Sequence, residues 1–99
     1  MFEKPLVAAL ALVAVHAHAQ NDAAARSLAA TCASCHGTDG RSVTKEVASL
    51  AGLPKDYLVA QMKAFRDSAR PATVMPQIAK GYSDAQIELV ADYLSRRPR

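Results

Sequence analysis

Large apolar side chains are scarce in this sequence. It has no tryptophan, two phenylalanines and three tyrosines. From Gln20 onward, leucine, isoleucine, valine and phenylalanine together account for 14 of 80 residues, and alanine makes up much of the remaining apolar content. A chain of this length with so few large apolar side chains does not fill a core unaided. We therefore expect one small domain, which excludes a multidomain enzyme, and a bound group that completes the core.

The sequence has one long hydrophobic run, which lies near residue 1. Lys4 precedes an apolar stretch from Leu6 to Val15, which the small-x-small sequence Ala17-His18-Ala19 follows. This order is typical of a cleavable secretory signal peptide, and the stretch is too short for a transmembrane helix. We expect residues 1–19 to be a signal peptide and residues 20–99 to form one domain without a membrane span. The periplasm is the expected location, and nucleic acid is not an expected partner there.

Cysteine and histidine are also rare, which excludes several kinds of site. The two cysteines are Cys32 and Cys35, and His36 is the one histidine of residues 20–99. Zinc needs three or four protein ligands, so these residues fit it poorly. A thioredoxin-like pair belongs in a βαβ context, but no alternating strand pattern is present. A plain disulfide would leave both His36 and the thin core unexplained.

The sequence Cys32-Ala33-Ser34-Cys35-His36 is a C-x-x-C-H motif, the attachment sequence of c-type haem. The cysteine spacing is about one helical turn, so both thiols are expected to form thioether bonds with the vinyl groups of one haem. His36 is expected to be the proximal iron ligand. The predicted cofactor is therefore one covalently bound haem c.

The sixth iron ligand cannot be a second histidine, which leaves Met75, Met62 or a lysine. Met62 falls within a helical pattern and is typical of a core methionine. Met75 lies in residues 71–82, a stretch with two prolines and a glycine that we expect to be irregular and to reach the opposite face of the haem. We favour Met75. Ligation by histidine and methionine raises the reduction potential and leaves no open iron position, so electron transfer is expected and catalysis is not.

Helical periodicity recurs in three segments, and the four glycines lie outside them. The first begins near residue 21, the second follows Pro54 and stops before Pro71, and the third begins at Ser83 with a capping box to Gln86. Each segment places apolar residues on one face: Ala25, Leu28, Ala29 and Cys32; then Leu58, Met62 and Phe65; then Ile87, Val90, Ala91 and Leu94. We expect an all-α domain with about three main helices around the haem.

The segment from Cys35 to Gly40, between an N-terminal helix and a methionine-containing segment, resembles the small class I cytochromes c. Further stretches resemble the cytochrome subunit of flavocytochrome c sulfide dehydrogenase: Leu50–Pro54, Tyr57-Leu58, Gln61-Met62, Phe65-Arg66, Arg70–Met75 and Ile78–Tyr82. The resemblance implies the class I cytochrome c fold and a partner, a FAD-containing flavoprotein that oxidises sulfide. Arg41 and Arg70 are either partners of the haem propionates or exposed surface charges.

The leading functional hypothesis is a monohaem electron carrier that accepts electrons from a flavoprotein sulfide dehydrogenase. One alternative is a general diffusible cytochrome c that feeds an oxidase or another reductase. Two others are a haem sensor or peroxidase with an open sixth position and a thiol–disulfide exchanger without haem. The formal net charge of +3 favours an acidic redox partner only weakly.

Overall fold

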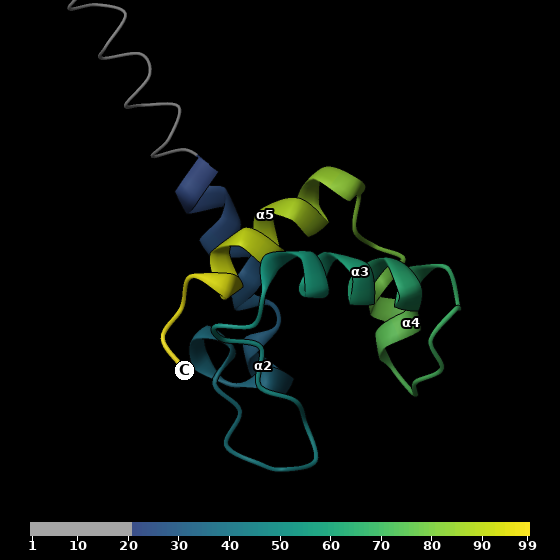
Figure 1. The fold of residues 1–99 in the computed structure, drawn as a ribbon, viewed down its shortest axis with the longest axis horizontal. Coiled ribbons are helices and arrows are strands. Elements are labelled where there is room, and N and C mark those ends of the chain that lie inside the picture. Colours follow the sequence, from purple (N-terminus) through teal and green to yellow (C-terminus); the bar gives the residue numbers. More distant parts are fainter. Residues whose placement is uncertain (1–20) are drawn as a thin grey trace, which may run out of the picture.

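The computed structural model describes residues 21–99 (Figure 1). The expected signal peptide, residues 1–19, lies outside them. Residues 21–30 are helical, and the elements that follow are α2 (Ala33–His36), the 3-10 turn η1 (Thr38–Gly40), α3 (Lys55–Arg66), α4 (Met75–Ala79) and α5 (Asp84–Ser95). No strand occurs within residues 21–99, and the expected all-α class is confirmed there. None of the helices in this part of the chain is long and apolar enough to cross a membrane.

Helix α5 begins as the sequence predicts. The Ser83 side chain accepts a hydrogen bond from the Gln86 backbone N–H at 3.2 Å, and the Gln86 side chain accepts one from the Ser83 N–H at 3.0 Å. This capping box satisfies two N–H groups that the first helical turn leaves without partners. The predicted apolar face is confirmed, since all four of its residues are buried: Ile87, Val90, Ala91 and Leu94.

Helix α3 follows Pro54, as expected, and ends at Arg66. Asp56 in its first turn and Lys63 and Arg66 in its last turn complement the helix dipole. The chain then leaves the helical conformation, because Ser68 has a positive φ of 59°. The helix therefore ends earlier than the expected stop before Pro71, and Arg70 lies beyond it.

The expectation that residues 71–82 are irregular throughout is wrong, because Met75–Ala79 form α4. Pro76 lies in the first turn, where a proline loses no helical hydrogen bond. The N–H groups of Gln77 and Ile78 both donate to the carbonyl of Val74, at 3.0 and 3.1 Å. Met75 is thus the first residue of a short helix.

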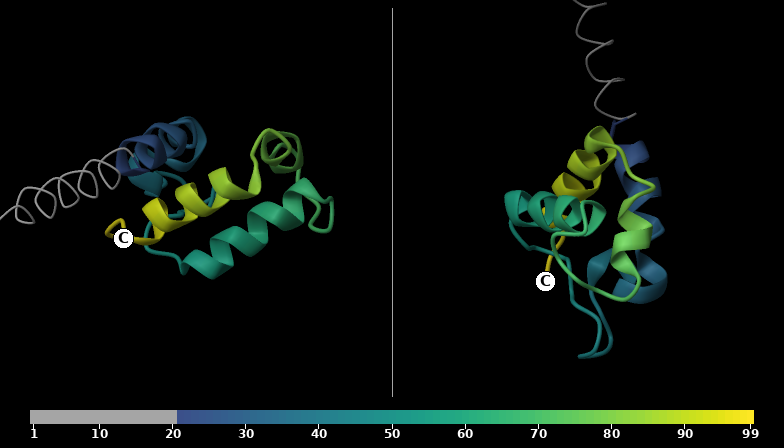
Figure 2. Two further views of the ribbon diagram at one scale, coloured as in Figure 1. Left: turned by 90° about the horizontal axis from the view of Figure 1, so that it is seen from above. Right: turned by 90° about the vertical axis from the view of Figure 1, so that its right-hand side faces the viewer.

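The buried core depends on small side chains where helices meet. Ala25 and Ala29 of the N-terminal helical residues pack with Val90 and Ala91 of α5 and with Leu58 of α3. In the left view of Figure 2, α5 lies between α3 and residues 21–30. Large apolar side chains remain exposed elsewhere, with exposed fractions of 42–94%: Val43, Tyr57, Val74 and Ile78. This distribution fits a domain whose core is completed by a bound group.

Candidate functional site

Both cysteines of the C-x-x-C-H motif lie on one helical turn. Cys32 is the N-cap of α2, and its carbonyl accepts hydrogen bonds from the backbone N–H groups of Cys35 at 3.3 Å and His36 at 2.9 Å. Both thiols are free; Cys32 is half-buried and Cys35 is exposed. The turn therefore presents two unpaired thiols and an imidazole from five consecutive residues, as the spacing predicts.

The Cys32 thiol lies in a half-buried position, which disfavours its thiolate form. Burial raises the pKa of this thiol above its ordinary value. Thiol–disulfide exchange requires the thiolate, and reactive C-x-x-C pairs lower the pKa of the attacking cysteine. This direction disfavours a thiol–disulfide exchanger.

The imidazole of His36 is oriented by a backbone carbonyl. Its Nδ1 atom lies 2.7 Å from the carbonyl oxygen of Ala48. A carbonyl oxygen only accepts hydrogen bonds, so the proton of the neutral ring is on Nδ1 and the lone pair is on Nε2. This tautomer is the one in which Nε2 can bind a metal. Ala48 was not predicted, because a backbone carbonyl has no sequence signature.

The loop that carries Ala48 is held at both ends. The carbonyl of Gly40 accepts hydrogen bonds from the N–H groups of Leu50 at 2.7 Å and Ala51 at 3.1 Å. Within the loop, the Ser42 N–H donates to Oγ of Ser49 at 3.0 Å. These bonds fix the backbone on either side of the carbonyl that His36 contacts.

The glycine after His36 is required by its conformation. Gly37 has a φ of +85°, and a Cβ atom at this position would lie 1.8 Å from the carbonyl oxygen of Arg41. A side chain is therefore excluded both by the backbone conformation and by space. The sharp exit from α2 lets the chain fold back beside His36.

Met75 is half-buried at the start of α4, and its neighbours are unusually exposed. Val74 and Ile78 have exposed fractions of 55% and 42%, whereas Ala79 is fully buried. The short helix and its N-cap residue, Val74, thus bear a thioether and two uncovered apolar side chains. Met62, the other candidate ligand, is half-buried within α3. The choice of Met75 over Met62 or a lysine stays a prediction.

The two arginines considered as propionate partners both contact groups of this chain. Arg41 donates to the carbonyl of Pro98 at 3.1 Å and lies 3.9 Å from the carboxylate of Asp39. The guanidinium of Arg70 lies 4.8 Å from the ring centre of Phe65. Tyr57 is 47% exposed on α3. These contacts are compatible with surface positions for both arginines.

A hydrogen bond that the sequence does not predict joins Thr31 and Tyr82. Oγ1 of Thr31, the residue before Cys32, lies 2.7 Å from Oη of Tyr82, which follows α4. The two residues are 51 positions apart. No local pattern predicts such a pair.

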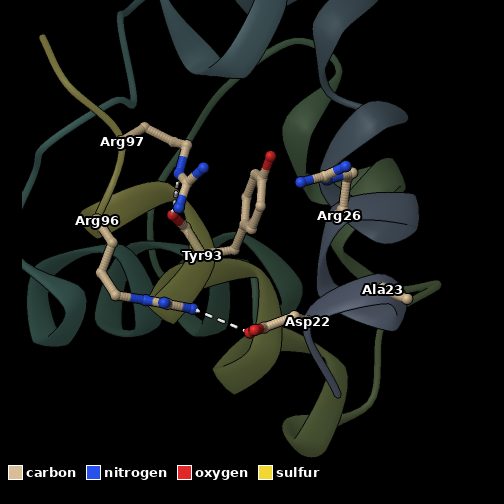
Figure 3. A pocket seen from close by; sticks show the side chains of 6 residues that line it. All are labelled: Asp22, Ala23, Arg26, Tyr93, Arg96 and Arg97. Carbon is tan, nitrogen blue, oxygen red and sulfur yellow. Dashed lines mark hydrogen bonds and ion pairs between the residues drawn. The ribbon is translucent and has the colours of Figure 1, made fainter. Parts of the chain in front are cut away.

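One surface pocket lies between α5 and the start of the described chain (Figure 3), lined by Asp22, Ala23, Arg26, Tyr93, Arg96 and Arg97. Arg96 pairs with Asp22 at 3.5 Å and with Asp92 at 3.0 Å. The Arg97 guanidinium lies 4.3 Å from the ring centre of Tyr93. Since these arginines have partners within the chain, the pocket is a polar junction between helices.

The donor set fits a haem and does not fit zinc. Within residues 21–99, no group of three or more histidine, cysteine or acidic side chains is placed to hold a metal ion. The chain offers instead one imidazole, two thiols on the same turn and a thioether on α4, which are donor types found in c-type haem sites. The exposed Val74 and Ile78 beside Met75 supply apolar surface for a large ring to cover.

Comparison with known proteins identifies the c-type cytochromes, the family that the sequence resembles. The family model described as "Cytochrome C oxidase, cbb3-type, subunit III" matches residues 19–94. The cytochrome subunit of sulfide dehydrogenase from Chlorobaculum tepidum is 39% identical over 66 residues, which cover 67% of this chain and 59% of that protein. A thiosulfate dehydrogenase electron acceptor from Thiomonas intermedia is 43% identical over 75 residues, covering 75% of this chain and 35% of that protein. The predicted resemblance is confirmed.

Cytochrome c-554(548) of Halomonas halodenitrificans is 40% identical over 68 residues, covering 66% of this chain and 82% of that protein. Among solved structures, cytochrome c4 of Acidithiobacillus ferrooxidans superposes with a TM-score of 0.63 at 40% identity, over 66% of this chain and 37% of that one. The predicted fold class is thus confirmed. The chain spans about a third to four fifths of the length of these proteins.

Proposed function

The chain belongs to the c-type cytochrome family whose model matches residues 19–94, and we propose that it is a periplasmic one-electron carrier whose iron is ligated by His36 and Met75. Proteins of this family carry covalently attached haem c, and the single C-x-x-C-H motif of this chain corresponds to one haem. When bound, the haem supplies an iron that accepts and releases one electron. Cys32 and Cys35 would hold it, and the carbonyl of Ala48 would orient the His36 ligand.

The observation that carries the proposal is the hydrogen bond between His36 and Ala48. The 2.7 Å contact holds the proton on Nδ1 and leaves the Nε2 lone pair for iron. It also restrains rotation of the ring, which a ligand on a half-exposed turn otherwise retains. Cys32 and Cys35 would hold the haem edge through thioether bonds from the same turn.

Met75 is the proposed sixth ligand. It is the first residue of a helix whose last residue, Ala79, is fully buried, so the helix that carries the methionine is anchored in the core. A methionine ligand fills the sixth position and favours the reduced iron, which suits a carrier with a raised potential. A sensor or peroxidase would instead require this position to be vacant.

We propose a flavoprotein sulfide dehydrogenase as the electron donor. The support is the 39% identity to the cytochrome subunit of sulfide dehydrogenase. A thiosulfate dehydrogenase electron acceptor is also similar, which supports sulfur oxidation as the wider setting. Electron-transfer partners commonly meet through small, transient interfaces, so the complex need not be tight.

A freely diffusing carrier is the second candidate. Its support is the 40% identity to cytochrome c-554(548), 82% of which is covered by the matched residues. In that case the donor and the acceptor would be general redox proteins, and no dedicated flavin subunit would accompany the chain.

Purification from the native cell at low salt separates the two candidates. The optical spectrum is recorded before and after addition of sulfide. A co-purifying flavin band with rapid haem reduction supports the sulfide dehydrogenase subunit. A haem spectrum without flavin that sulfide does not change, even after mild chemical cross-linking before lysis, supports the diffusible carrier. A protein without covalent haem would contradict both.

A further inference from the structure

Thr31 and Tyr82 form a hydrogen bond whose direction can be assigned. Oγ1 of Thr31 lies 2.7 Å from the carbonyl oxygen of Leu28 and 2.7 Å from Oη of Tyr82. A hydroxyl has one proton, and the Leu28 carbonyl can only accept. Thr31 therefore donates to Leu28, and Tyr82 donates to Thr31.

Thr31, at one end of this hydrogen bond, adjoins the proposed haem-binding turn, residues 32–36. Thr31 immediately precedes Cys32, whose N–H donates to the carbonyl of Ala29 at 3.0 Å. The carbonyl of Cys32 in turn accepts from the N–H of His36 at 2.9 Å. Thr31 is thus covalently joined to Cys32, the residue whose carbonyl is hydrogen bonded to the backbone of His36.

Tyr82, at the other end of this hydrogen bond, is linked to α4. The N–H of Tyr82 donates to the carbonyl of Ala79 at 3.1 Å, and Ala79 is the fully buried last residue of α4. The Tyr82 ring is half-buried and packs against the core cluster. A displacement of α4 away from the C-x-x-C-H turn would have to break the Thr31–Tyr82 bond or distort one of these turns.

We propose that Tyr82 is a positioning residue for Met75: its hydroxyl, by donating to Thr31, holds α4 beside the haem-binding turn and keeps the methionine on the iron. This inference rests on the proposed ligation by His36 and Met75. Tyr82 is not a proposed iron ligand; its effect would be on the equilibrium between the methionine-bound state and a state open to other ligands.

The test uses the full-length holoprotein and imidazole as a competing ligand of the oxidised iron. Tyr82→Phe removes the hydroxyl and keeps the ring. It is expected to raise the apparent affinity for imidazole about fivefold, the effect of losing one hydrogen bond of ordinary net strength. Thr31→Val is expected to produce the same increase, and the double variant no further increase. Thr31→Ser retains a hydroxyl and is expected to restore the parent affinity.

Tyr93→Phe is the matched control. It also removes a tyrosine hydroxyl that donates a hydrogen bond, in this case to Asp39 at 3.1 Å, but that bond has no connection to α4. Loss of global stability is measured separately by denaturant unfolding. If Tyr93→Phe and Tyr82→Phe raise imidazole affinity equally, the effect is general loosening and the positioning role is overturned.

The methionine–iron absorption band of the oxidised protein distinguishes failure of this inference from failure of the proposed function. If Met75→Leu leaves the parent spectrum unchanged, the ligand assignment itself is wrong. If Met75→Leu removes the band while Tyr82→Phe leaves the imidazole affinity at the parent value, the ligation stands and the role of Tyr82 is overturned.

Discussion

The Nδ1 atom of His36 donates a hydrogen bond to the carbonyl oxygen of Ala48, 2.7 Å away. This bond makes the proposed iron ligand depend on the loop of residues 41–50, which contributes no ligand itself. Donation from Nδ1 increases electron density on the ring and strengthens Nε2 as a donor to oxidised iron. The loop is therefore expected to influence the reduction potential.

Ser49→Ala tests this dependence. The variant removes the hydrogen bond from the Ser42 N–H to Oγ of Ser49, which closes the loop beside Ala48. A less restrained carbonyl weakens the bond to His36, so the reduction potential is expected to rise by less than about 60 mV, the value of a tenfold change in a one-electron equilibrium. Potentiometric titration measures the shift.

The control for this prediction is Ser95→Ala, which removes a hydrogen bond from a serine side chain to the Asp92 carbonyl on α5. Its potential should equal that of the parent. A potential that falls in Ser49→Ala, or that shifts equally in both variants, would contradict the role assigned to the loop.

Gly37→Ala is expected to impair formation of the holoprotein. The φ of +85° alone costs an alanine about 1–2 kcal/mol, and the overlap with the Arg41 carbonyl adds to that cost. The yield of covalently attached haem and the denaturant midpoint of any folded product measure the effect. Gly81→Ala is the matched control, because a Cβ atom there lies at an ordinary 3.4 Å from its nearest neighbour. Equal yields from both variants would show that the turn after His36 tolerates a side chain.

The sequence predicts those parts of the fold that local chemistry encodes. The capping box of Ser83 and Gln86 and the apolar face of α5 are adjacent in sequence, and both are confirmed. The C-x-x-C-H turn is encoded in the same way, within five residues.

Features that depend on tertiary contacts were not predicted. Pro71, Pro76 and Gly81 favour an irregular segment, yet Pro76 fits the first turn of α4, where it costs no hydrogen bond. The partner of His36 is the backbone carbonyl of Ala48, and every residue type has such a carbonyl, so the sequence does not identify it. The sequence thus predicts a motif for haem attachment, but it does not predict the contacts that orient the proposed iron ligands.

Asp84→Asn tests the ion pair that joins the end of α3 to the start of α5. The hydrogen bond from Arg66 lowers the pKa of the Asp84 carboxyl below its ordinary value. A lowered folded-state pKa contributes stability that is fully present above the unfolded-state pKa and is lost as the pH falls through the folded-state pKa. Asp84→Asn is therefore expected to lower the denaturant midpoint at neutral pH, and the two midpoints should converge below about pH 4.

Arg66→Gln should reproduce this loss at neutral pH, and the double variant should add little to it, because both changes remove the same pair. Glu88→Gln provides the comparison, since it breaks the separate Lys55–Glu88 pair at 3.2 Å between the same two helices. Denaturant unfolding of the holoproteins from pH 3 to 7 measures these effects. A difference between Asp84→Asn and the parent that stays constant over this range would rule out the ionised carboxylate as its source.

Met75→Leu tests the sixth ligand, with Met62→Leu as its matched control. Both changes remove a sulfur atom and nearly conserve volume, so the change in packing alone is expected to cost each variant less than about 1.5 kcal/mol of folding stability. If Met75 ligates the iron, only its loss should abolish the methionine–iron band, lower the reduction potential by at least about 60 mV and allow the reduced protein to bind carbon monoxide. Met62→Leu should leave all three properties unchanged, because in this proposal Met62, which is half-buried within α3, does not ligate the iron. If only Met62→Leu produced these changes, the sixth ligand would be Met62. A parent protein that already binds carbon monoxide readily would mean that the sixth position is open, which would replace the electron carrier with a sensor or peroxidase.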